Sequence, residues 1–247
     1  MKQNKEKEGN MPGEQEGPFL LVDQAERLRL VSLYQKAFSA VSGNPQIMQD
    51  VFCARVLNPY TIKPDVFVCE YAWAVFNSGM KMEIIKGKWP LLERIFKHWD
   101  YNAICQNKSL IHKEALVAFN HAGKIEAVLH VADFISKNGW ATVRSAILAG
   151  LMRSSNNIYP SQQFFDYIRK LPRPNWMGPT NSRFLAKNLG FDLAKDDRHM
   201  KRLASQNGYP ANAQGVQCFA EKISQCVGER VSVVETVLWN ASKLRVI

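Results

Sequence analysis

The sequence contains few cysteines, and no two of them have the spacing of a metal site. The five are scattered through apolar stretches, without a CxxC pair or a Cys/His cluster: Cys53, Cys69, Cys105, Cys218 and Cys226. Zinc and iron–sulfur sites need such clusters, so we expect neither. An odd, dispersed set also argues against a disulfide framework and predicts buried thiols in a reducing compartment.

Long apolar runs are absent as well. No stretch of about 18 apolar residues could span a bilayer, and the N-terminal residues lack the apolar segment of a signal peptide. We therefore expect a soluble intracellular protein, in the cytoplasm and nucleoid or in a nucleus, with no membrane partner. Residues 1–17 contain methionine as their only clearly apolar residue type, which predicts a disordered tail ahead of one folded region over 18–247.

Runs with the two-residue period of β-strands are missing. Apolar residues recur instead at helical spacing between turn residues, which predicts an all-α globule of about ten short helices with two lobes around a cleft. The expected helical ranges are 23–42, 45–57, 65–79, 80–100 (one or two helices), 109–121, 124–138, 144–152, 164–171, 181–189, 197–202 at least, 216–226 and 231–243.

Acidic residues are scarce relative to basic ones. The chain has 32 Lys and Arg against 22 Asp and Glu, a formal net charge of +10. This excess favours an anionic partner. Nucleic acid is the first candidate, an anionic membrane surface the second, and a basic surface without a partner the alternative to both.

The most informative stretch runs from Leu171 to Arg202. A turn rich in Pro and Gly leads into the helix expected at about 181–189, which Gly190 is placed to end. Near Gly178, backbone N–H groups at the helix start could converge on one phosphate, because no Cβ blocks the approach and the helix dipole favours negative charge. An ordinary corner between two helices would use the same residues.

Two aspartates open the next expected helix. Asp197 stands two residues before His199 and five before Arg202, and these basic residues lie one turn apart, where both could contact a phosphate. The alternatives are an aspartate that only caps the helix and a solvated basic face. Asp196 is the rival carboxylate.

Glu70 is the one charged residue in the apolar helical stretch VFVCEYAWAVFNSGM (66–80). A carboxylate among apolar side chains needs a partner, so Glu70 is a candidate functional residue. The alternative is a structural partner at a solvent or cleft edge.

Three blocks carry a resemblance to a known family. FNSGM (76–80) followed by IIK (84–86) is similar to a helix pair that lines a base pocket. NHAGKIEA (120–127) is similar to an N-x-x-K-I-x-A helix start, and GPT (178–180) with DRHMKR (197–202) matches a hairpin and its D-x-H-[VIM]-x-R segment. VVETVLW (233–239) resembles the closing helix. These blocks resemble the helix-hairpin-helix (HhH-GPD) DNA glycosylases, and the first is most similar to type I 3-methyladenine glycosylases.

The resemblance implies an enzyme that flips a damaged or modified base out of double-stranded DNA, works as a monomer, and hydrolyses the N-glycosidic bond. Asp197 would be catalytic, stabilising the positive charge on the sugar and orienting water. The implied DNA contacts are Met177, Gly178, Thr180, His199, Arg202 and Lys124, with the hairpin centred on 171–190. The candidates for the base pocket are Glu70, Tyr71, Trp73, Phe76 and Trp99, and for each aromatic one a place in the core is the favoured alternative.

The chain also departs from the family. Thr180 stands where bifunctional members carry a Schiff-base lysine, and Lys187 lies about two turns too far along the helix. We therefore expect a monofunctional glycosylase that needs no metal or organic cofactor. The glutamate and tryptophan of the type I pocket would fall near Ala74 and Met82, and the zinc ligands have no counterpart, so the excised base is not predicted.

Three other functions stay open at this stage. The chain could be a non-catalytic DNA-binding protein that keeps the hairpin, a bifunctional glycosylase/lyase with an unrecognised lysine, or a helical adaptor for an acidic protein.

Overall fold

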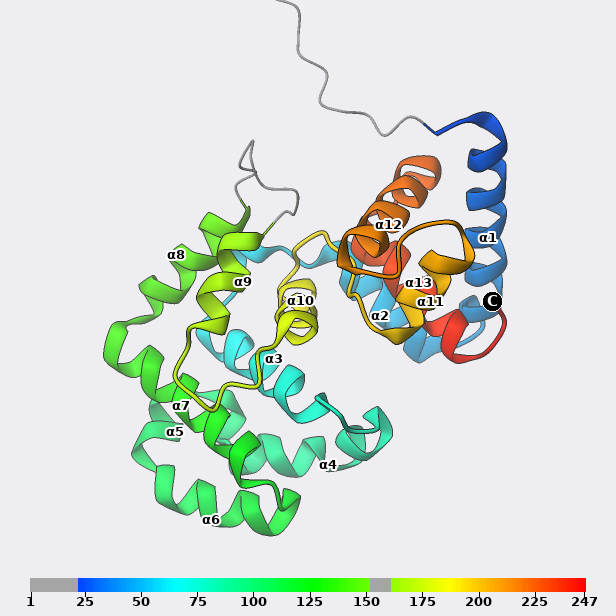
Figure 1. The fold of residues 1–247 in the computed structure, drawn as a ribbon. Helices are drawn as coiled ribbons and strands as arrows, with labels where there is room; N and C mark the ends of the chain where they lie inside the picture. Colours follow the sequence, from blue (N-terminus) through cyan, green and yellow to red (C-terminus); the bar gives the residue numbers. More distant parts are fainter. Residues whose placement is uncertain (1–21, 152–160) are drawn as a thin grey trace, which may run out of the picture.

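The computed structural model describes residues 22–151 and 161–247, and within them the chain is all-α, with no strand (Figure 1). The tail expected at 1–17 lies outside the described residues. The helices are α1 (Gln24–Ser42), α2 (Pro45–Val56), η1 (Pro59–Thr61), α3 (Pro64–Asn77), α4 (Met82–Ile95), η2 (Lys97–Trp99), α5 (Tyr101–Gln106), α6 (Lys108–Phe119), α7 (Ala122–Asn138), α8 (Trp140–Leu151), α9 (Gln162–Arg169), α10 (Pro179–Asn188), α11 (Arg198–Gln206), α12 (Ala213–Val227) and α13 (Val231–Lys243).

Local capping chemistry sets several of these boundaries. Asp23 caps α1, because its carboxylate accepts a hydrogen bond from the Glu26 N–H at 2.7 Å, and Gly43 ends the same helix. Gly190, with φ near +90°, follows α10, where its N–H and that of Phe191 satisfy carbonyls of the last turn. These ends were predicted from the sequence.

Other boundaries differ from the prediction. The break between α6 and α7 lies at Asn120, which ends α6 in the left-handed conformation (φ 49°), so Gly123 is inside the first turn of α7. Asparagine tolerates this conformation because its short polar side chain bonds locally. Helix α5 was not predicted. It is short, and Asp100 supports it by accepting from the N–H groups of Asn102 and Ala103.

The buried apolar side chains form two separate clusters. One contains residues of α3 to α10, from Ile62 to Leu193. The other joins α1 and α2 at the start of the chain to α11, α12 and α13 at its end. Figure 1 shows these helices as two groups. The chain passes between the clusters after α2 and again just before α11.

Arg230 ties the two groups together at these crossings. Its guanidinium donates to the carbonyls of Ala54 (2.9 Å) and Leu57 (3.0 Å) at the end of α2, and to that of Gly190 (2.7 Å) after α10. Gly190 approaches the Leu57 carbonyl so closely that a Cβ there would lie 3.0 Å from its oxygen. Arg230 satisfies carbonyls that the ends of both helices leave free.

Some burial predictions were wrong. None of the five cysteines is fully buried: Cys53 is exposed and the other four are half-buried, and all are free. Phe52 and Val56 are more than half exposed despite their apolar side chains, because α2 buries only the face that carries Ile47 and Val51. In the described part of the chain, no helix is long and apolar enough to cross a membrane.

Candidate active site

A pocket of about 700 Å³, called here the central pocket, is lined by helices that belong to both core clusters. Helices α2 and α13 supply one wall, and α3, α4 and α10 supply the other. Such a volume lies within the usual range of pockets for small-molecule ligands. The aromatic lining residues are Trp73, Trp89, Phe184 and Trp239, and the charged ones are Asp50, Glu70, Lys86, Lys187, Lys195, Glu235 and Lys243.

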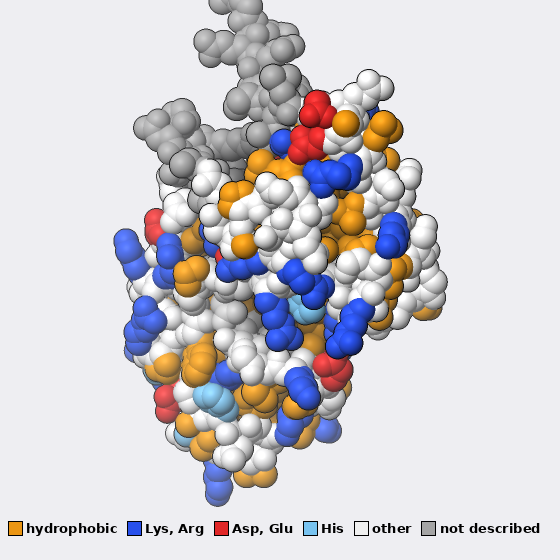
Figure 2. Space-filling model, turned by 45° about the vertical axis from the view of Figure 1, so that its right-hand side comes forward, with side chains coloured by type: hydrophobic (Ala, Val, Ile, Leu, Met, Phe, Trp, Pro, Cys, Tyr) orange, Lys and Arg blue, Asp and Glu red, His pale blue; other side chains and the backbone are white. Residues whose placement is uncertain are grey.

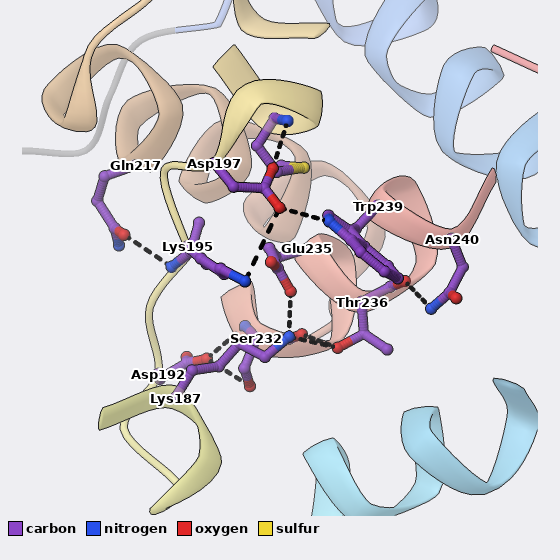
Figure 3. Close-up of polar contacts among 12 residues, drawn as sticks. Lys187, Asp192, Lys195, Asp197, Gln217, Ser232, Glu235, Thr236, Trp239 and Asn240 are labelled. Carbon is purple, nitrogen blue, oxygen red and sulfur yellow. Dashed lines mark hydrogen bonds and ion pairs between the residues drawn. The ribbon is translucent and has the colours of Figure 1, made fainter. Parts of the chain in front are cut away.

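Asp197 is fixed next to this pocket by four contacts, of which Figure 3 shows those with Trp239 and Lys195. It caps α11, because its Oδ1 accepts from the backbone N–H groups of His199 (2.9 Å) and Met200 (3.2 Å). Its Oδ2 accepts from Trp239 Nε1 at 2.6 Å and lies 3.9 Å from Lys195 Nζ. Asp197 does not line the pocket, but both Trp239 and Lys195 do. The carboxylate is therefore held beside two residues that line the pocket, with little freedom to move.

Lys195 places an ammonium group between this carboxylate and the pocket. Its Nζ lies 3.9 Å from the centroid of the Phe184 ring, a cation–π distance. Burial lowers the pKa of Lys195, and the nearby carboxylate of Asp197 opposes that effect. Lys195 was not singled out from the sequence, although it stands two residues before Asp197.

A second buried charge pair crosses the pocket from α10 to α13. Lys187 Nζ donates to Glu235, which is 1% exposed, and also to Thr236 Oγ1 at 3.1 Å. Lys187 lies in the last turn of α10, about two turns beyond Thr180, as expected from the sequence. The last turn of α10 faces the pocket, so the side chain lines it.

Glu70 lines the opposite wall, on α3. Its Oε2 accepts from Asn188 Nδ2 at 2.8 Å, and among the described residues it has no ion-pair partner. Burial raises the pKa of Glu70 to about 7, and the Asn188 hydrogen bond only partly offsets this. Two adjacent residues of α10 therefore contact the two acids. Lys187 forms an ion pair with Glu235, and Asn188 donates an uncharged hydrogen bond to Glu70.

Two of the five residues that were expected in a base pocket lie at the central pocket. Glu70 and Trp73 line the central pocket, and Trp73 packs edge-to-face on Trp89 at 4.8 Å. Tyr71, Phe76 and Trp99 do not line it and are at most 3% exposed. The prediction was wrong for these three residues, because they lie on the face of the helical segments that packs into the core.

The hairpin residues before α10 differ from the expectation in which side chains they expose. Gly178 is exposed and caps α10 without a side-chain hydrogen bond, and Thr180 is half-buried in the first turn. Met177 was expected to contact DNA, but it is 2% exposed, because it packs into the larger core cluster. Trp176 is the exposed side chain here, and its Nε1 donates to the Gly123 carbonyl at 3.0 Å.

His199 and Arg202 do lie together, at the start of α11. Arg202 Nη2 donates to Ser242 Oγ at 2.6 Å, and His199 Nδ1 is 3.4 Å from the same oxygen. Burial lowers the pKa of His199. The rival carboxylate, Asp196, is 5% exposed and paired with Arg183 and Lys201, each at 3.3 Å. Asp196 thus has a structural role in the described contacts.

Lys124 was expected at the DNA interface, and the structure corrects this. The side chain is 1% exposed, and its ammonium donates to the carbonyls of Phe76 (3.0 Å) and Ser78 (2.5 Å) at the end of α3. Burial lowers its pKa to about 8. Lys124 satisfies a helix C-terminus and is not available to a phosphate.

We predict that Lys124→Met destabilises the fold. The two carbonyls at the end of α3 would lose their donor, at a cost of about 1–3 kcal/mol. Urea unfolding at neutral pH measures the effect. A Lys124→Met protein as stable as the wild type would contradict the structural role of Lys124.

Basic side chains are also spread over one face of the molecule. In the view of Figure 2, Lys and Arg are spread over the face, with few acidic side chains among them. Among the described residues, no group of three or more His, Cys, Asp or Glu could hold a metal ion. Comparison with protein-family models, with curated proteins and with solved structures finds no match for this chain.

Proposed function

We propose that the protein is a DNA glycosylase of the helix-hairpin-helix type, with two helical lobes around the central pocket. It binds double-stranded DNA as a monomer, flips a damaged or modified base into the pocket, and hydrolyses the N-glycosidic bond in base excision repair. The observation that carries this proposal is the Asp197 carboxylate, held by two backbone N–H groups and by the indole of Trp239, which lines an aromatic pocket.

The proposed roles follow from the contacts. Cleavage of the N-glycosidic bond builds positive charge on the sugar, and a preorganised carboxylate stabilises that charge without having to reorient. Trp73, Trp89 and Phe184 offer aromatic surface for a base outside the stack. Gly178 and the free N–H groups of the first turn of α10 would bind a backbone phosphate, and His199 and Arg202 would bind another near the flipped nucleotide.

An excision assay tests the proposal. The purified protein is incubated with duplexes that each carry one lesion, and abasic sites are then cleaved with alkali. We expect strand cleavage that depends on both alkali and lesion. Salt-dependent DNA binding with no product from any lesion would favour a non-catalytic DNA-binding protein instead.

Lys195 favours a second candidate function, a glycosylase that is also a lyase. The pKa of this lysine is lowered by burial, and its Nζ lies at the pocket 3.9 Å from Asp197. Such an amine could form a Schiff base with the sugar. Borohydride trapping of a protein–DNA adduct that Lys195→Gln abolishes would establish this function, and absence of any adduct would leave the hydrolytic one.

A further inference from the structure

The proposed function leaves one acid in the central pocket without a role. Glu70 lies on the wall opposite the α13 residues Glu235 and Trp239, and its one described polar partner is the uncharged amide of Asn188. Glu70 is half-buried, whereas the fully buried acid of the pocket, Glu235, has Lys187 as its partner. The two carboxyl groups therefore stand in different surroundings, an arrangement that separates acid from base roles in enzymes.

The surroundings of Glu70 favour a protonated carboxyl group. Burial raises its pKa to about 7, so at neutral pH a large fraction carries a proton and can donate it. No cation pairs with it among the described residues. Every helix that lines the pocket also contributes another titratable group. These groups are Asp50 and Cys53 on α2, Cys69 on α3, Lys86 on α4, Lys187 on α10, Lys195 in the loop before α11, and Glu235 and Lys243 on α13.

We infer that Glu70 is the general acid that protonates the departing base, and that the substrates are uncharged bases. This inference rests on the proposed function. An uncharged base leaves as an anion unless it receives a proton, whereas a base made cationic by alkylation leaves neutral and needs none. A pocket lined by four lysines and three acids gives a cationic base no net electrostatic preference.

The step balances without a co-reactant. The C1′–N bond breaks, its electron pair goes to the base, and the Glu70 proton passes to a nitrogen or oxygen of the base. Water adds to C1′ beside Asp197 and loses its proton to solvent. Glu70 then recovers a proton from solvent, so the products are the free base and an abasic site.

The test is the pH profile of single-turnover excision. For the wild type, the rate on an uncharged lesion should fall as pH rises through about 7, because the acid form is lost. Glu70→Gln should lower the rate by about 10²-fold and flatten the profile, since an amide cannot donate the proton. Asn188→Leu removes the hydrogen bond that lowers the pKa of Glu70, so its profile should shift to higher pH.

A second readout does not depend on activity. When the pKa of a carboxyl group is higher in the folded than in the unfolded state, the protein becomes less stable as the pH rises between the two pKa values. For Glu70 these values are about 4.5 and about 7. The melting temperature of the wild type should therefore fall relative to that of Glu70→Gln across this window. Glu93→Gln, which changes a carboxylate outside the pocket on α4, is the matched control and should follow the wild type.

The outcomes separate this inference from the proposed function. Excision that is equally fast in Glu70→Gln, or a preference for cationic alkylated bases, would overturn the role of Glu70 while leaving the glycosylase in place. No excision by the wild type from any duplex would overturn both. If the stability difference between the wild type and Glu70→Gln did not change between pH 4.5 and 7, the raised pKa of Glu70 would itself be contradicted.

Discussion

Asp197→Asn should lower the single-turnover rate of base excision by on the order of 10³-fold while the protein still folds and binds DNA. Asparagine caps helices about as well as aspartate, so the N-terminus of α11 should persist. What is lost is the negative charge that faces the sugar. The amide also cannot satisfy both the backbone N–H groups and Trp239 Nε1, which costs about 1 kcal/mol of stability.

The neighbouring Asp196→Asn is the matched control for this prediction. Asp196 is buried with Arg183 and Lys201, so its substitution should lower the stability and leave the excision rate of the folded protein near that of the wild type. Full activity in Asp197→Asn, or loss of activity in Asp196→Asn at equal folded fraction, would contradict the assignment of the carboxylate.

Lys187→Met should destabilise the fold by about 3–5 kcal/mol, measured by urea unfolding at neutral pH. The substitution leaves the Glu235 carboxylate, which is 1% exposed, without its cation. Thr236 cannot replace it, because its hydroxyl donates to the Ser232 carbonyl at 2.8 Å. An uncompensated buried charge is among the most costly defects that a single substitution produces.

Two further variants separate charge from packing in this experiment. The double variant Lys187→Met/Glu235→Gln removes both charges and should regain most of the lost stability. Lys137→Met breaks an exposed pair with Asp133 and should change the stability little. A Lys187→Met protein as stable as Lys137→Met would mean that the buried pair has no role in joining α10 to α13.

The helical fold could largely be predicted from local signals. Asp23, Gly43 and Gly190 set helix ends through capping chemistry that depends only on neighbours in the sequence. Burial was harder to predict, because it depends on which face of a helix meets the rest of the chain. The sequence around Phe52 and Tyr71 carries apolar residues on several faces, and only packing decides that Phe52 is exposed and Tyr71 is core.

The candidate site was predicted only in part, for the same reason. Asp197 could be found because its surroundings in the sequence, a hairpin and a basic helix start, are local. Glu235 and Trp239 reach the site from α13, far from Lys187 and Asp197 in the sequence, and nothing in their own neighbourhood indicates the partners that they contact. Lys124 was misplaced because its residue type suggests phosphate, whereas the contacts that bury it are carbonyls 46 and 48 residues away.

The most direct test of the central claim is the affinity for a duplex that carries a cationic pyrrolidine in place of one deoxyribose, compared with the uncharged tetrahydrofuran analogue. The cation imitates the charge on the sugar in the transition state, which an enzyme binds more tightly than its substrate. The wild type should bind the cationic duplex at least about tenfold more tightly, a difference of roughly 1.4 kcal/mol, and Asp197→Asn should lose this preference. Equal affinity of the wild type for both duplexes, or a preference that survives in Asp197→Asn, would contradict a catalytic carboxylate at the central pocket.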